Sequence, residues 1–332
     1  MVRLGYALSS EEHRPSDLVR NARLAEEAGF SFALISDHFH PWVETQGQSP
    51  FVWSVLGGIA EATTTLEVGT GVTCSTIRTH PAIIAHAAAT MGAMMEGRFF
   101  LGVGSGENLN EHVLGDRWPD WDVRSRMLVE AVEVIRELWR GEVTSHDGEF
   151  YTVENARLYT LPEKPVPIHV AASGPRAAKV ASKIGDGLIA TGPEKELLAT
   201  FDRGGKHGRP KYGQLTVCWS RDEARARKTA LRMWPTAAIP GESGQELPNP
   251  KHFEQLAKIV TEDMIAERIT CGPDIDRHVA AIQEYVDAGF DHVYIHQVGP
   301  DQGGFIEAYA RDVLPRFEKS ADERRVRAKG AA

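Results

Sequence analysis

The sequence predicts an α/β protein, a (β/α)8 TIM barrel with insertions. Three observations lead to this fold. Eight short apolar runs alternate with helical patterns along the chain. The segment EAGF at 27–30, before the second run, is echoed by DAGF at 287–290, before the eighth, which indicates a repeated unit. A length of 332 residues suits one such barrel with insertions.

The predicted strands are short and mostly apolar, as parallel strands buried on both faces should be. They cover residues 4–8, 32–35, 66–72, 98–103, 165–170, 187–190, 215–219 and 292–296. Helices are predicted at 15–28, 51–63, 81–91, 123–139 and 175–184. Proline at the first position and glycine after the last position set several of these helix boundaries.

A single domain is predicted for residues 1–317. Extended pieces at 149–153 and 156–159 belong to an insertion at about 141–162. Residues 235–262 are rich in Pro, Gly and Glu, fit no repeat, and are predicted to be a second insertion or a mobile segment. Residues 318–332 are mostly charged residues and alanine, which is typical of a tail.

The composition excludes several classes of function. A net charge of -9 argues against nucleic acid as the main partner. No apolar run is long enough to span a membrane, and the N-terminus leads directly into a strand, so a cytoplasmic location is expected. Cys74, Cys218 and Cys271 are far apart and form no Cys-x-x-Cys pair, so we expect buried thiols.

The densest group of reactive and stacking side chains is the SDHFHPW stretch at 36–42, directly after the second strand. In a barrel of this class, the segments that follow the strands meet at one mouth, where chemistry takes place. The segments expected there are Glu11, 37–42, 71–76, 104–111, 173–174, 191–192 and His296.

Four features of the expected mouth are candidates for chemistry. His38 is a candidate general base, oriented by Asp37 or by a backbone group, because neutral imidazole accepts a proton near pH 7. Trp42 either stacks on a flat ligand or simply packs. Glu107 follows a glycine loop as a candidate acid, or only begins a helix. Residues 173–174 precede a helix as an anion site or a plain cap.

The residues leave two other functions open. His38 and His40 have the spacing of a metal-ligating pair, and His169 and His296 could supply further ligands, as in a zinc-dependent hydrolase. The sixth strand, however, offers no histidine, so we predict no metal site. The third alternative is a barrel that binds a ligand without catalysis.

The motifs together resemble the luciferase-like barrel superfamily. More narrowly, they resemble its branch of coenzyme F420-dependent glucose-6-phosphate dehydrogenases and secondary alcohol dehydrogenases. The resemblance runs from residue 3 to about 317. It is carried by Gly5, Tyr6, Glu11, 36–42, 102–111, 172–175 and 185–187.

This resemblance implies an oxidoreductase that moves hydride from a CH–OH carbon of a sugar, a sugar phosphate or a secondary alcohol to coenzyme F420. It implies that His38 takes the hydroxyl proton and that Glu107 acts on the reduced ring from the opposite side. Trp42 would steady the developing charge and Glu11 would line the substrate pocket. A cis peptide is implied between Gly71 and Val72. The implied coenzyme contacts are Asp37, Gly71, Val72, Cys74, Asn110, Ser173, Gly174 and Thr191.

The cations that would hold a sugar phosphate are only partly matched. Pro193 and Gln255 stand where the resemblance leads us to expect lysine, and Arg277 remains. Lys195 and Lys251 lie nearby in the sequence. The expected substrate contacts are Arg277, Lys195, Gln255 and His296. The resemblance further implies that the protein is a homodimer. It also implies that the protein binds a small-molecule substrate.

Overall fold

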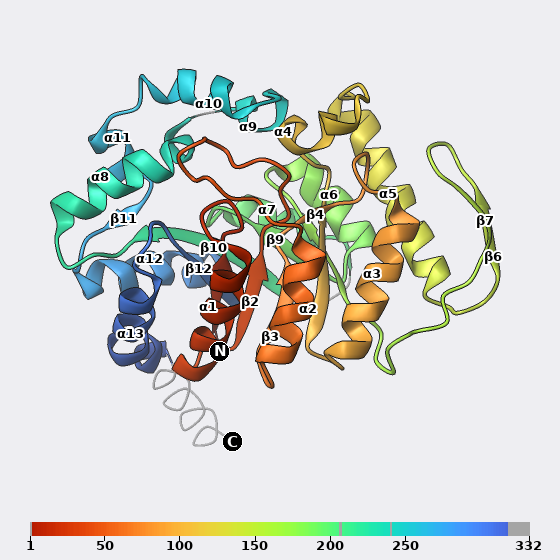
Figure 1. Cartoon of the computed structure of the whole chain (residues 1–332), viewed down its shortest axis with the longest axis horizontal. Coiled ribbons are helices and arrows are strands. Elements are labelled where there is room, and N and C mark those ends of the chain that lie inside the picture. The colour runs from red at the N-terminus through yellow and green to blue at the C-terminus, as the bar shows by residue number, and fades with distance from the viewer. Residues whose placement is uncertain (1, 206–207, 240, 318–332) are drawn as a thin grey trace.

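The structure is a computed structural model that describes residues 2–205, 208–239 and 241–317. In these residues, eight parallel strands form one ring in the order β10-β12-β1-β2-β3-β5-β8-β9, and β9 pairs with β10 to close it. Helices lie around the outside of the ring (Figure 1). The predicted (β/α)8 barrel is confirmed.

The elements alternate along the chain as a barrel of this class requires. The eight strands are β1 (Arg3–Leu8), β2 (Phe32–Ile35), β3 (Glu67–Thr70), β5 (Phe99–Gly104), β8 (Ile168–Ala171), β9 (Gly187–Ala190), β10 (Lys211–Cys218) and β12 (His292–Gln297). The outer helices are α1 (Pro15–Ala28), α2 (Val52–Ala62), α3 (Pro81–Met94), α5 (Trp121–Leu138), α6 (Pro175–Ile184), α7 (Lys195–Asp202), α8 (Glu223–Met233), α12 (Ile275–Ala288) and α13 (Gln302–Asp312). Shorter elements are β4 (Thr73–Cys74), α4 (Asn108–Glu111), η1 (His112–Leu114) and β11 (Thr270–Cys271). Among the described helices, none combines the length and apolar character needed to cross a bilayer.

Some boundaries differ from the sequence prediction. The third predicted strand is divided into β3 and β4, and the bond between Gly71 and Val72 that separates them is cis, as the resemblance implies. Helices α7, α8 and α13 were not predicted. In α8 the buried face consists of Ala226 and Ala230, so its apolar periodicity is too weak to indicate a helix.

Both predicted insertions contain secondary structure. The first holds an antiparallel hairpin, β6 (Thr144–Asp147) and β7 (Thr152–Ala156), on the edge of the molecule (Figure 1). The second holds η2 (Pro235–Ala238), α9 (Ser243–Glu246) and α10 (Pro250–Ala257), followed by α11 (Glu262–Ala266). The predicted tail at 318–332 lies outside the described residues.

The interior of the barrel is filled with aromatic side chains. Phe32, Phe100, Tyr212 and Tyr294 are buried there. His169 stacks on Phe100 and also contacts Tyr212, with ring centroids 4.7 and 4.9 Å away. Burial lowers the pKa of His169 to about 3, so its ring stays neutral. His169 therefore belongs to the packed interior, and a ligand must bind at the mouth.

This packing requires glycine opposite the large rings. A Cβ atom on Gly69 would lie 2.0 Å from the Phe100 ring. We predict that Gly69→Ala lowers the free energy of unfolding by about 1–3 kcal/mol, because the barrel would be overpacked. Gly57→Ala is the matched control, since its Cβ would meet nothing within 4 Å in α2. Urea unfolding of both variants tests this, and equal stabilities would contradict it.

Candidate functional site

A cavity of about 670 Å³ opens at the mouth of the barrel. Its volume is in the usual range for small-molecule sites. Seven predicted site residues line it, namely Glu11, His38, Trp42, Gly71, Glu107, Thr191 and His296. The barrel rule therefore brings together residues from the loops after β1, β2, β3, β5 and β9 and from the C-terminal end of β12.

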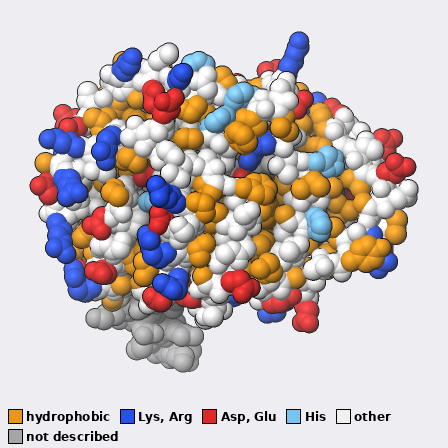
Figure 2. All heavy atoms as spheres, viewed as in Figure 1, with side chains coloured by type: hydrophobic (Ala, Val, Ile, Leu, Met, Phe, Trp, Pro, Cys, Tyr) orange, Lys and Arg blue, Asp and Glu red, His pale blue; other side chains and the backbone are white. Residues whose placement is uncertain are grey.

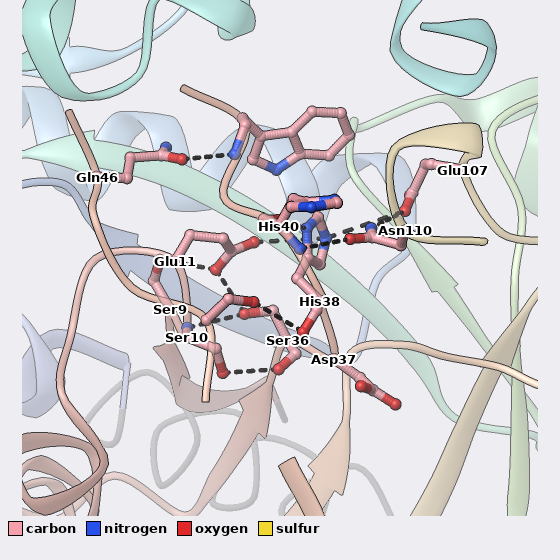
Figure 3. Close-up of polar contacts among 12 residues, drawn as sticks. Ser9, Ser10, Glu11, Ser36, Asp37, His38, His40, Gln46, Glu107 and Asn110 are labelled. Atoms are coloured by element: carbon pink, nitrogen blue, oxygen red, sulfur yellow. Dashed lines mark hydrogen bonds and ion pairs between the residues drawn. The ribbon is translucent and has the colours of Figure 1, made fainter. Parts of the chain in front are cut away.

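His38 is held in one orientation by the backbone. Its Nδ1 lies 3.1 Å from the carbonyl oxygen of His40. Because a carbonyl only accepts hydrogen bonds, Nδ1 donates and the lone pair of the neutral ring is on Nε2. Nε2 lies 3.4 Å from Glu11 Oε1 and 3.9 Å from Glu107 Oε2 (Figure 3). The basic nitrogen of His38 therefore faces two carboxylates.

Glu11 is a buried carboxylate beside this base. Burial alone raises the pKa of Glu11, but the His38 imidazole and the Ser36 hydroxyl outweigh burial and hold the pKa below its usual range. The Ser36 hydroxyl donates to Oε2 over 2.6 Å, and the Ser9 hydroxyl donates over 3.0 Å. Glu11 is thus ionised at neutral pH and stabilises a proton on His38 Nε2.

The sequence left open whether Asp37 or a backbone group orients His38. In the structure, Asp37 does not orient it. Figure 3 shows its carboxylate pointing away from the imidazole. Arg78 Nη2 donates to Oδ1 over 2.9 Å, and the Thr73 hydroxyl donates to Oδ2 over 2.9 Å. The backbone N–H of Arg78 also donates to Glu111 Oε2 over 2.7 Å. Arg78 thus joins two buried carboxylates, while a coenzyme contact by Asp37 stays a prediction.

Asn110 connects the loop of His38 to the loop of Glu107. Its Oδ1 accepts hydrogen bonds from the backbone N–H groups of Phe39 and His40, over 2.9 and 3.2 Å. Its Nδ2 donates to Glu107 Oε2 over 3.1 Å. Asn110 is buried and is not among the residues that line the cavity. In this structure its contacts position the two candidate catalytic groups.

His38 and Glu107 lie side by side. The expectation that they flank one planar ring is wrong, because a ring stacked between them needs a gap of about 7 Å, twice a carbon–carbon contact distance. The distance between His38 Nε2 and Glu107 Oε2 is only 3.9 Å. Both groups therefore lie on the same side of the cavity.

Trp42 forms part of the cavity wall. Its ring lies 5.2 Å from that of His38 and packs edge-on against Phe253 of α10, also at 5.2 Å. The Gln46 side chain accepts from the backbone N–H of Trp42 and donates to the Met233 carbonyl. The second insertion therefore packs against the loop that carries His38 and covers one side of the cavity.

The other predicted coenzyme residues do not line the cavity. Val72 packs on the interior aromatic cluster. Cys74 is buried, and burial raises the pKa of its thiol well above the usual value. Ser173 is exposed, and a Cβ on Gly174 would meet nothing within 4 Å. Their coenzyme contacts stay predictions.

Three of the four expected substrate residues do not line the cavity. Lys195 and Gln255 are exposed on α7 and α10. Arg277 donates to Glu223 Oε1 over 3.2 Å and to the Cys271 carbonyl. Among the residues that the structure describes, Arg268 is the single lysine or arginine lining the cavity, and its side chain has no partner there. Sequence reasoning missed it because it lies in an irregular segment without a motif.

The metal alternative lacks a ligand set in the described part of the chain. No three His, Cys, Asp or Glu side chains gather there in a way that could hold an ion. His38 and His40 do not converge, because His40 Nδ1 donates to the Leu109 carbonyl over 2.8 Å and its ring stacks near His112. The three cysteines are free and buried, as predicted.

The fold and the site define an α/β barrel with a histidine and two carboxylates at its mouth. Residues 1–292 match the model of the luciferase-like monooxygenase family, so the chain belongs to that family. It is 39% identical to an F420-dependent glucose-6-phosphate dehydrogenase of Beutenbergia cavernae, over 98% of this chain and 100% of the relative. It is 38% identical to an F420-dependent glucose-6-phosphate dehydrogenase of Microbacterium testaceum, over 96% of this chain and 98% of the relative. The fold is also similar to a solved structure of an F420-dependent secondary alcohol dehydrogenase in complex with an F420-acetone adduct. The two chains are 29% identical and superpose with a TM-score of 0.88, over 94% of this chain and 98% of the solved one.

The buried arginine generates a prediction about stability. Arg78→Met leaves Asp37 and Glu111 without their counter-charge, so we expect the free energy of unfolding to fall by about 3–5 kcal/mol. The control is Arg126→Met, which removes a bidentate but exposed ion pair with Glu149 and should change stability little. Denaturant unfolding measures both. Equal losses in the two variants would show that Arg78 does not hold the site together.

Proposed function

We propose that the protein is a coenzyme F420-dependent dehydrogenase that oxidises a CH–OH group of a sugar, a sugar phosphate or a secondary alcohol. The observation that carries the proposal is the orientation of His38, whose basic Nε2 faces the cavity beside Glu11 and Glu107. The names of the relatives support the same reaction and the same coenzyme.

The cavity has the properties that a deazaflavin requires. Leu34 and Tyr294 supply apolar surface, and Gly71 and Gly192 leave backbone open to close approach. A volume of about 670 Å³ accommodates a tricyclic ring together with a small alcohol. Glu107, Gly71 and Thr191 would hold the ring, and Ser173 and Gly174 would lie beyond it. Bound there, the coenzyme supplies a carbon that accepts a hydride, which is two electrons in one step.

The residues of the chain then divide the work of alcohol oxidation. His38 Nε2 accepts the hydroxyl proton while the adjacent carbon loses hydride and a carbonyl forms. Ionised Glu11 stabilises the resulting imidazolium. Glu107, held by Asn110, is the second proton-exchanging group at the same side of the cavity. Trp42 and Phe253 restrict access of water to this pair.

The charge lining the cavity bears on the substrate. A phosphate would meet the guanidinium of Arg268, but also the carboxylates of Glu267 and Glu284. A phosphate held by one arginine loses part of the charge-assisted bonding that a cluster provides. Neutral alcohols and sugars therefore belong among the proposed substrates beside glucose 6-phosphate.

We also propose a homodimer that works in the cytoplasm, where the three free thiols would stay reduced. Hydrophobic side chains gather over α2 and α3 (Figure 2). Phe51 and Ile83 are each 61% exposed, and Met94 is 43% exposed. Contiguous apolar surface of this kind is typical of an interface. If α2 and α3 form the dimer contact, Ile83→Asp should halve the mass measured by light scattering, and an unchanged mass would place the contact elsewhere.

The base assignment is tested by His38→Ala. We expect turnover to fall about a hundredfold or more, because the variant has no group to accept the hydroxyl proton. Affinity for the coenzyme should barely change. Loss of deazaflavin absorbance measures turnover, and titration of the variant with the coenzyme measures affinity. Wild-type turnover in this variant would reject the assignment of His38 as the base.

A further inference from the structure

A second buried carboxylate–imidazole pair lies next to the first. The consecutive residues Glu11 and Glu12 each contact a histidine from a different strand end. Glu11 contacts His38, and Glu12 Oε1 lies 3.2 Å from His296 Nε2. The side chains of Glu12 and His296 are 1% and 3% exposed. The proposed reaction uses the first pair and leaves the second without a role.

The contacts of Glu12 determine which nitrogen of His296 is available. A carboxylate oxygen accepts hydrogen bonds, so His296 Nε2 donates to Oε1. The other oxygen, Oε2, accepts the Gly299 N–H over 2.8 Å. The neutral imidazole therefore carries its lone pair on Nδ1. Through its contact with Nε2, Glu12 fixes the orientation and the tautomer of this ring. A carboxylate has the same effect on a histidine that binds a metal.

The lone pair of His296 has no partner within the described residues. Nδ1 is buried and accepts no hydrogen bond. Buried polar atoms are almost always paired, and an unpaired one calls for a specific explanation. His296 lines the cavity, as does Trp234, whose ring lies edge-on to the imidazole at 4.5 Å. Nδ1 is therefore a buried, unpaired acceptor on a residue that lines the proposed substrate site.

We propose that His296 Nδ1 accepts a hydrogen bond from a second hydroxyl group of the substrate, so that the enzyme selects polyols over alcohols with one hydroxyl. Glu12 is the positioning residue that presents this nitrogen. The inference rests on the proposed dehydrogenase function. The first hydroxyl is oxidised: its proton goes to His38, hydride leaves its carbon for the deazaflavin, and a carbonyl forms. The second hydroxyl is bound and is not consumed.

The choice of a hydroxyl follows from the chemistry of the wall. An imidazole lone pair pairs with an O–H or N–H donor and not with a phosphate or a carboxylate. A dry site built to bond a hydroxyl discriminates strongly against an analogue that lacks it, because its own polar atom is then left unpaired. His38 Nε2 and His296 Nδ1 each carry a lone pair. These two acceptors thus suit a substrate with two hydroxyls.

The test compares alcohols that differ by one hydroxyl. Turnover of the coenzyme-loaded enzyme is followed with butan-2-ol, butane-2,3-diol and butane-1,3-diol. We expect kcat/KM for the better diol to exceed that for butan-2-ol by at least about tenfold. In the double variant His296→Phe/Glu12→Gln, which leaves no buried charge unpaired, this ratio should fall to near one. A ratio is insensitive to the fraction of folded enzyme. His86→Phe on the outer face of α3 is the control and should keep the ratio.

A second readout needs no turnover. In protein labelled with ¹⁵N-histidine and free of coenzyme, the Nδ1 signal of His296 should mark an unprotonated nitrogen. It should shift on addition of the diol and not on addition of butan-2-ol. A diol preference that survives the double variant, equal rates for the alcohols, or an unmoved Nδ1 signal would overturn the inference while leaving the dehydrogenase intact. Failure of every alcohol, glucose 6-phosphate included, to bleach the coenzyme would overturn the proposed function, and the inference with it.

Discussion

The buried guanidinium of Arg78 is the interaction on which the rest of the site depends. It lies between Asp37, at the end of β2, and Glu111, in the helical segment after β5. These two loops also carry His38 and Glu107. With Asn110 bonded to the backbone of one loop and the carboxylate of the other, the network sets the relative position of the proposed base and the proposed acid. Burying three charges is costly, and mutual pairing offsets that cost only when the geometry holds.

This arrangement explains how carboxylates of different roles coexist in one small region. Asp37 and Glu111 are paired with an arginine and serve structure. Glu11 is paired with an imidazole and a hydroxyl, and its depressed pKa keeps it ionised beside the proposed base. Glu107 is more exposed and is bonded to a neutral amide. The environment of each carboxylate, rather than its type, assigns its role.

Sequence reasoning recovered what depends on pattern. Alternating apolar runs predicted the barrel, and the barrel rule placed Glu11, His38, Trp42, Glu107 and His296 at one mouth. It did not recover what depends on tertiary partners. Arg78 carries no motif, and its importance is visible only once two distant carboxylates surround it. Arg277 matched a pattern but is paired with Glu223, while Arg268 matched none and faces the cavity.

The central claim is that His38 and Glu107 act together, from one side, on a ring bound at the barrel mouth. A crystal structure of the complex with the deazaflavin tests it most directly. The account predicts ring density in the cavity lined by Leu34, Gly71 and Tyr294, within contact of both side chains, and with His38 Nδ1 still bonded to the His40 carbonyl. A ring bound elsewhere, or a ring that contacts neither group, would contradict it.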